Sequence, residues 1–171
     1  MKIADLREST CPGCGLWMPP SDTAINQGYY NSSAECWDLY TEVLGEEYNN
    51  AVLAGQVQQF TVDAYAVQHA GGPHPDNSVG IHLSGLYLMF EKGVRPPYVP
   101  PILHRLATNL RVWPHFPPPD QKGGMTICDV AMCSSAQDHI RTVREWAQSV
   151  WVSWTPYHSE LANIISNHIS L

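Results

Sequence analysis

The sequence predicts a mainly α-helical protein, a bundle of four to five helices that follows an irregular N-terminal zinc-knuckle segment, with one or two short strands. Four long segments carry apolar residues at spacings of three and four, which places them on one face of a helix. Capping serines precede several of these segments, and glycine or proline follows most of them. The 171 residues are 44% hydrophobic, which is enough for one core and predicts a single domain over residues 1–171.

The first half of the helical region contains three of these segments. Ser32 or Ser33 can cap the first one, and Ser78 can cap the third. Gly71-Gly72 ends the second, because glycine readily adopts the left-handed conformation that closes a helix. We therefore predict helices over residues 33–49, 51–69 and 78–92.

The second half contains a short helix, a short strand and a long C-terminal helix. Prolines occupy much of the chain between the helices, and Ser134 or Ser135 can cap the last one. Pro156 interrupts that helix, since proline lacks the amide hydrogen that the helical ladder requires. The predicted elements are a helix over 102–112, a strand over 125–130 and a helical stretch from 135 to 168.

Residues 1–33 are predicted to be irregular and residues 34–171 to form the helical core. The irregular segment contains Cys11-Pro-Gly-Cys14-Gly, in which glycine allows a tight turn that brings both thiolates to one ion. This motif predicts half of a zinc site. Two alternatives stay open: unligated thiols in a loop, and a redox pair, although a redox motif of this kind usually follows a strand.

The remaining zinc ligands must come from the helices, because the chain has no second CxxC motif. Cys36 and His69 are the best candidates, since an antiparallel pair of helices brings the start of the first close to the end of the second. In such a pair the two residues would differ in position along the helix axis by several residues, on the order of 8 Å at a rise of about 1.5 Å per residue. The alternative is that both are ordinary core residues, as a cysteine or histidine on an apolar face often is.

A second set of residues predicts a different metal site. Three imidazoles and one carboxylate in the core of a bundle can hold a catalytic divalent ion with an open coordination position. The alternative is that the last histidine only faces the surface. The residues of this additional pocket are Asp63, His82 and His158, together with His69.

Charge and composition exclude several classes of partner. The formal net charge is −7, with nine basic residues and no basic cluster, so neither nucleic acid nor an anionic membrane surface is an expected partner. The start of the chain carries no apolar signal segment, which predicts a cytoplasmic protein. Five cysteines do not suit a disulfide framework, and we interpret Cys128 and Cys133 as ordinary thiols.

Five motifs together resemble an uncharacterised bacterial family that is known as a domain of unknown function. The motifs are CPGCG, AECWDLYTEVLGEEY, TVDAYAVQH, IHLSGL, and VREWAQSVWVSW followed by a histidine. The resemblance covers most of the chain and implies no activity. It implies that Cys11, Cys14, Cys36, Asp63, His69, His82 and His158 belong to the family pattern. Gln59 and Tyr157 stand where the family commonly has histidine, which weakens the case for a histidine-based catalytic centre.

Three functions remain open at this point. The first is a zinc-stabilised helical domain with a binding or regulatory role, whose ligands are Cys11, Cys14, Cys36 and His69. The second is a metal-dependent hydrolase or thiol transferase that uses the His/Asp pocket. The third is a helical protein without metal that forms a homodimer through its aromatic faces. The substrate or protein partner is not specified by the sequence.

Overall fold

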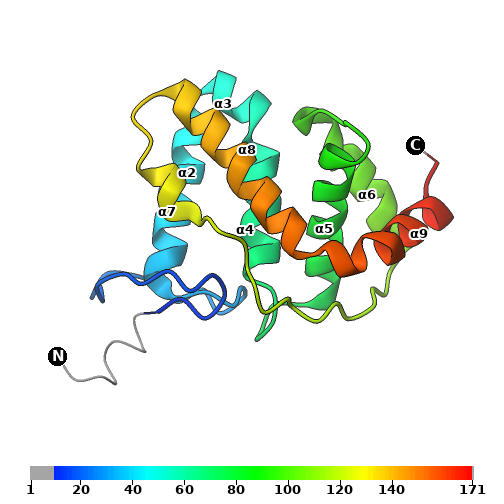
Figure 1. Cartoon of the computed structure of the whole chain (residues 1–171), viewed down its shortest axis with the longest axis horizontal. Helices are drawn as coiled ribbons and strands as arrows, with labels where there is room; N and C mark the ends of the chain where they lie inside the picture. The colour runs from blue at the N-terminus through cyan, green and yellow to red at the C-terminus, as the bar shows by residue number, and fades with distance from the viewer. Residues whose placement is uncertain (1–9, 171) are drawn as a thin grey trace.

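Helix α4 (Gln58–Gln68) lies in the middle of the fold, and most of its residues are buried. In the computed structural model, which describes residues 10–170, α2 lies on one side of α4 and α5 on the other, while α8 crosses it (Figure 1). A helix that is buried on nearly all sides has neighbours on nearly all sides. The other elements are therefore arranged around α4.

The regular structure of residues 10–170 is helical, which confirms the predicted fold class. The only β pairing described is a single bridge between Thr10 and Trp17. None of the helices in this part of the chain has the length and apolar character needed to cross a membrane. The elements are α2 (Ala34–Asn49), α3 (Ala51–Gln56), α4 (Gln58–Gln68), α5 (Asp76–Phe90), η1 (Pro96–Tyr98), α6 (Val99–Asn109), α7 (Ile127–Ala131), α8 (Ala136–Ser153), η2 (Thr155–Tyr157) and α9 (His158–His168).

The helix starts follow the capping chemistry of the sequence. The Ser33 hydroxyl accepts from the amide of Cys36 at the start of α2, and Ser135 accepts from the amide of Asp138 at the start of α8. Both caps satisfy amides that have no partner within the helix. The predicted break at Pro156 is confirmed, because the short η2 separates α8 from α9.

Three of the predicted helices have different boundaries. The helix predicted over 78–92 is α5, which begins at Asp76 after Pro75, so the predicted cap at Ser78 is wrong. The predicted helix over 51–69 is two helices, α3 and α4, which meet at Val57, a buried residue with φ −135° and ψ −20°. The helix predicted over 102–112 is α6, which begins three residues earlier, at Val99. It can do so because proline is tolerated in the first turn, where the amides are unpaired in any case.

The predicted strand over 125–130 is wrong, because this segment forms the short helix α7. Thr126 and Asp129 form a capping box at its start: the Thr126 hydroxyl accepts from the amide of Cys128, and Asp129 accepts from the amide of Thr126 at 2.7 Å. A local polar pair thus decides the conformation, whereas the apolar residues of so short a segment fit either structure.

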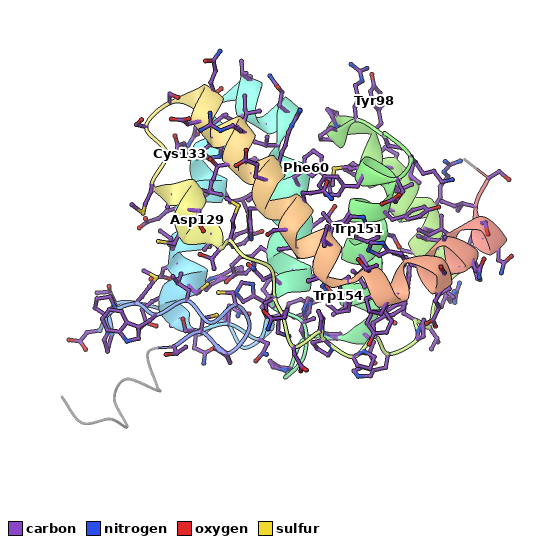
Figure 2. The ribbon with its side chains drawn as sticks, viewed as in Figure 1. Phe60, Tyr98, Asp129, Cys133, Trp151 and Trp154 are labelled. Carbon is purple, nitrogen blue, oxygen red and sulfur yellow. The ribbon has the colours of Figure 1, made fainter. Side chains whose placement is uncertain are left out.

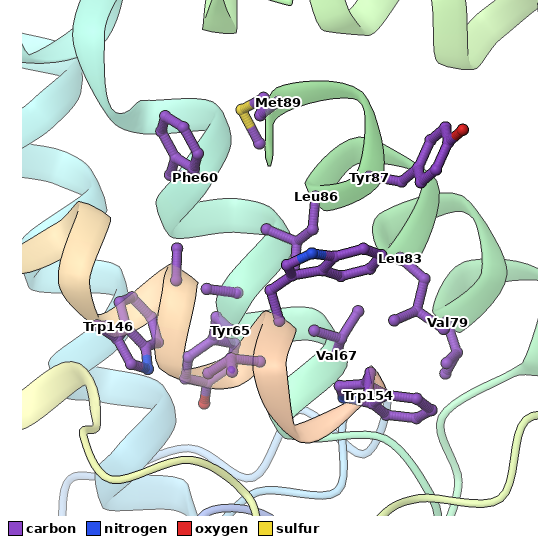
Figure 3. Packing of buried hydrophobic residues seen from close by; sticks show 14 of the residues in the cluster. Phe60, Tyr65, Val67, Val79, Leu83, Leu86, Tyr87, Met89, Trp146 and Trp154 are labelled. Carbon is purple, nitrogen blue, oxygen red and sulfur yellow. The ribbon is translucent and has the colours of Figure 1, made fainter. Parts of the chain in front are cut away.

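The tryptophans of α8 and its C-cap form part of the core, as Figure 3 shows for Trp146 and Trp154. The indole N–H of Trp146 donates to Gln68 Oε1 at 3.0 Å, and that of Trp151 donates to Glu91 Oε1 at 2.8 Å. Each large ring is therefore buried without leaving its N–H unpaired. The Gln68 amide also donates to the carbonyls of Lys122 and Met125, which joins the loop before α7 to α4.

Glycine 85 allows α4 and α5 to approach closely. A Cβ atom at Gly85 would overlap the buried carboxylate of Asp63 on α4. Neither helix can move away easily, because both pack against α8. The sequence position of this glycine is therefore set by the neighbouring helix and not by a turn.

We expect Gly85→Ala to lower the free energy of unfolding by about 1–3 kcal/mol, because the added methyl group overpacks the contact between α4 and α5. The matched control is Gly45→Ala in α2, where a Cβ atom meets nothing within 4 Å. That control should raise stability by about 0.5–1 kcal/mol through helix propensity. Urea unfolding of both variants measures the difference, and equal stability of the two would contradict the close contact.

Candidate metal centre

The CPGCG motif forms a tight turn in the irregular N-terminal segment. The amide of Cys11 donates to the carbonyl of Leu16 at 2.8 Å, and the amide of Gly15 donates back to the carbonyl of Cys11 at 2.9 Å. Gly15 has φ +79°, a left-handed conformation that favours glycine. The turn therefore folds from its own backbone, with both cysteines on it. Residues 1–9 of the predicted irregular segment lie outside the described residues.

The turn packs directly on the end of α4. A Cβ atom at Gly13 would overlap the carbonyl oxygen of Asn31 and lie 2.6 Å from Cδ2 of His69. The amide of Asn31 donates to the carbonyl of His69 at 3.1 Å, which joins the N-terminal segment to the C-cap of α4. Glycine is thus required at position 13 by close approach to the His69 ring.

Four side chains from three parts of the chain converge at this contact. The ligand atoms of Cys11, Cys14, Cys36 and His69 all lie within 4.8 Å of one another. The Sγ atoms of Cys14 and Cys36 are 3.8 Å apart, and Cys36 Sγ is 3.4 Å from His69 Nε2. A tetrahedral zinc ion with ordinary bond lengths places two sulfurs about 3.8 Å apart and a sulfur and a nitrogen about 3.5 Å apart. The cluster could therefore hold a metal ion of this kind.

The His69 ring is oriented by Tyr65, one turn earlier on α4. Nδ1 of His69 donates to the carbonyl of Tyr65 at 2.7 Å, so the proton is on Nδ1 and the lone pair of Nε2 faces the cysteines. The two rings also stack, with centroids 3.9 Å apart. The Tyr65 hydroxyl lies 3.7 Å from Cys36 Sγ and donates to it. One residue thus orients two of the four candidate ligands.

The cluster is closed to solvent on most sides, because Cys11, Cys36 and His69 are buried and only Cys14 is partly exposed. The hydrogen bond from the Cys14 thiol lowers the pKa of Cys11, whereas contact with Cys11 raises the pKa of Cys14 to about 12 and also raises that of Cys36. The neighbouring thiols thus favour one thiolate, at Cys11, and oppose ionisation of the other two. A divalent cation among them would remove this opposition and favour the thiolates.

The expected offset between Cys36 and His69 is wrong, and the break at Val57 explains why. In one continuous helix over 51–69, His69 would extend several residues past the level of Cys36. The structure instead uses six residues for the separate helix α3, so that only α4 runs back along α2 (Figure 1). The C-cap of α4 therefore lies level with the first turn of α2.

The second predicted set is only partly brought together. His82 Nδ1 donates to Asp63 Oδ1 at 2.7 Å, and the Gln59 amide lies 2.9 Å from both oxygens of that carboxylate. Burial raises the pKa of Asp63, and the hydrogen bond from His82 opposes this increase. Asp63 is thus satisfied by one histidine and one amide, while His69 belongs to the cysteine cluster.

His158 does not join Asp63 and His82. Its ring stacks on Trp151 with centroids 3.6 Å apart, and its Nε2 donates to the Trp151 carbonyl at 3.0 Å. Within residues 10–170, the cysteine cluster with His69 is the only group of three or more such side chains close enough to share an ion. Cys128 and Cys133 lie outside it and are free thiols, with Cys133 Sγ 3.3 Å from the Thr142 hydroxyl.

A buried Glu–His pair was not predicted. The carboxylate of Glu47 on α2 accepts from Thr61 on α4 at 2.7 Å and from His139 Nε2 on α8 at 2.8 Å, and all three residues are buried. The other oxygen, Oε2, has no hydrogen-bond partner among the described residues. Glu47 continues the spacing of Cys36, Tyr40 and Val43 on the buried face of α2, and this periodicity is the signal that could have indicated its burial.

His74 is a second residue that the sequence did not single out. Its Nδ1 donates to the carbonyl of His69 at 3.2 Å, and its Nε2 accepts from the Ser78 hydroxyl at 2.8 Å. Burial lowers the pKa of His74 to about 4, so the ring is neutral near pH 7. A neutral ring with one donor and one acceptor links the end of α4 to the start of α5 and supports the candidate ligand His69.

Comparison with known families decides the classification. A family model described as a family of unknown function, DUF5946, matches residues 9–155. The chain belongs to this family. The match spans the cysteine turn and helices α2 to α8, so the candidate metal centre lies within the family region. Neither a curated protein nor a solved structure matches the chain.

We expect Gly13→Ala to push the cysteine turn of this DUF5946 domain away from the His69 ring, and thus to weaken the binding of any metal ion that the cluster holds. A displacement of a few tenths of an ångström is enough to distort a tetrahedral site, and we expect the metal affinity to fall at least about tenfold, as for other lost supporting contacts. The matched control is Gly124→Ala, where a Cβ atom has open space. Competition with a chromophoric chelator measures both affinities, and equal values would contradict the packing described.

We expect His139→Leu to lower the free energy of unfolding by about 1–3 kcal/mol, because it removes a hydrogen-bond partner from the buried Glu47 side chain. Adding Glu47→Leu should restore at least about 1 kcal/mol, since an apolar pair leaves no buried acceptor without a partner. Urea unfolding of the single and double variants measures both values. A double variant less stable than His139→Leu would show that the pair itself, and not the unsatisfied acceptor, determines the stability.

Proposed function

We propose that this protein is a zinc-binding helical domain, with a structural metal held by Cys11, Cys14, Cys36 and His69 and with a binding or regulatory role. The observation that carries the proposal is the spacing of the four ligand atoms, in particular 3.8 Å between two sulfurs and 3.4 Å between sulfur and nitrogen. These are the edges of a tetrahedron around zinc.

The type of ligand favours zinc over other ions. Three thiolates and one imidazole are soft or borderline donors, which suit zinc and do not suit magnesium or calcium. The intramolecular contacts of His69 and Cys36 with Tyr65 supply the outer hydrogen bonds that such ligands usually have. Thiolates of this kind persist in a reducing compartment, and this supports a cytoplasmic location.

The number of ligands favours a structural role. Four protein ligands complete a tetrahedral site, whereas a catalytic zinc ion keeps one position for water or substrate. The ion would join the N-terminal turn, the start of α2 and the end of α4, and its binding free energy would add to the free energy of folding. The alternative of a hydrolase or thiol transferase has less support, because neither His158 nor His69 joins the pair formed by Asp63 and His82.

We expect protein purified without added metal to contain about one zinc ion per chain, and chelation to lower the melting temperature. Cys11→Ser and Cys14→Ser should each lose most of the metal and show the same reduced stability as the chelated protein. Cys128→Ser and Cys133→Ser are the matched controls, because these thiols lie outside the cluster, and they should keep both metal and stability. Elemental analysis and thermal unfolding provide the two measurements.

Two results would contradict the proposal. One is a protein that contains no zinc, takes up none, and unfolds at the same temperature with and without chelator. The other is a protein in which the control variants lose as much zinc as Cys11→Ser and Cys14→Ser. A homodimer that survives chelation would favour the metal-free alternative only together with the first of these results.

A further inference from the structure

A cleft lies at the end of α4 that is remote from the cysteine cluster. Two adjoining cavities form it, one of about 290 Å³ between α3, η1 and α8, and one of about 620 Å³ along the outer face of α8. Both are lined by Arg144 of α8, which therefore lies at their junction. We call this feature the arginine cleft, and its defining residues are Gly55, Arg95, Tyr98, Arg144, Phe90 and Val152.

Two positive charges converge in the arginine cleft although the protein is acidic, with nine basic and sixteen acidic residues. Arg95 and Arg144 both line the smaller cavity. Within residues 10–170, the ion pairs formed by arginine involve Arg141 and neither of these two side chains. Two arginines without a carboxylate partner are thus directed to one small space in a protein that has a surplus of carboxylates.

Aromatic rings hold both guanidinium groups. The Arg95 guanidinium carbon lies 4.9 Å from the centre of the Tyr98 ring, and the same guanidinium donates to the Tyr98 hydroxyl at 3.0 Å. The Arg144 guanidinium carbon lies 6.0 Å from the centre of the Phe60 ring. Figure 2 labels Phe60 and Tyr98 at this end of the molecule. Arg95 thus uses one N–H group on Tyr98, and its remaining N–H groups, together with those of Arg144, can donate hydrogen bonds to a carboxylate.

The larger cavity has a different lining. Phe90 and Val152 supply apolar surface, and Phe90 packs against Phe60 with ring centroids 5.2 Å apart. Glu145 also lines this cavity, with its carboxylate 3.9 Å from the Arg141 guanidinium. A negative charge at this position disfavours a ligand with several negative charges, such as a phosphate, and is compatible with a ligand whose second end is apolar.

We propose that the arginine cleft binds a small organic monocarboxylate, with the carboxylate between Arg95 and Arg144 and the apolar body along Phe90 and Val152. Nothing in the candidate zinc site enters this proposal, and none of the cleft residues is a candidate metal ligand. The ligand class follows from three features: two guanidinium groups that form no ion pair within residues 10–170, one apolar wall, and one acidic residue that disfavours further negative charge.

The test uses hexanoate as the probe on the full chain with its metal content unchanged. Hexanamide has the same body without the charge, and acetate has the charge without the body. A ligand of this size is expected to bind with a Kd on the order of 1 mM. Chemical shift changes of backbone amides around α8 and η1 measure binding during each titration. Hexanamide and acetate should each bind at least about fivefold more weakly than hexanoate.

Arg144→Gln should weaken hexanoate binding at least about tenfold, because it removes a charge-assisted hydrogen bond. Arg95→Gln should weaken it by a smaller factor. The matched control is Arg111→Gln, the same change at an exposed arginine outside the cleft, and it should leave the Kd unchanged. Arg95 and Arg144 are exposed, so both variants should keep the melting temperature of the native protein.

Three outcomes would overturn the proposal. Hexanamide could bind as tightly as hexanoate, Arg144→Gln could bind hexanoate as tightly as the native protein, or hexanoate could fail to saturate the protein up to about 20 mM. Because zinc content is measured separately, each of these results leaves the proposed zinc site unaffected. In the same way, loss of zinc in Cys11→Ser with unchanged hexanoate binding would leave the cleft proposal intact.

Discussion

The contact between Cys36 at the start of α2 and His69 at the end of α4 is the constraint around which the N-terminal half is arranged. Cys36 Sγ and His69 Nε2 are 3.4 Å apart. The first turn of α2 and the C-cap of α4 must therefore lie at the same level along the pair of helices. The turn that carries Cys11 and Cys14 can reach both only where they meet, and Gly13 leaves no space for a side chain between the turn and the His69 ring. Residues 10–33 contain no helix or strand, so this part of the chain is positioned by its cysteine side chains and by the backbone hydrogen bond from Asn31 to His69.

Local chemistry explains which parts of the fold could be predicted. The caps at Ser33 and Ser135 and the interruption at Pro156 depend on residues a few positions apart, and the structure has all three where the sequence indicates them. The break at Val57 has only a weak local signal, Gly55 two residues earlier, because an isolated glycine is tolerated in a helix and Val57 itself lies within a continuous apolar stripe. It is set by packing: α3 turns aside, and only then does α4 reach the correct level against α2.

The same distinction applies to the site residues. The CxxC motif could be read directly, and Cys36 and His69 followed from the idea of an antiparallel pair, even though their predicted levels were wrong. Glu47 and His139 are separated by 92 positions, and their pairing depends on how α8 crosses the bundle. The spacing of residues in one segment does not determine the angle at which another helix packs against it. Buried polar pairs between distant helices therefore stay outside what one sequence specifies.

The two ends of α4 differ in chemistry in a way that follows from the fold. At its C-terminal end, sulfur and imidazole groups are buried and face one another, an arrangement that suits an ion and leaves no room for a larger ligand. At its N-terminal end, the break at Val57 separates α3 from α4, and the cleft between α3, η1 and α8 contains Arg95 and Arg144. The break that brings His69 level with Cys36 thus also shapes one wall of the cleft, because Gly55 of α3 lines it. A single irregularity in the helical pattern accounts for the position of both candidate sites.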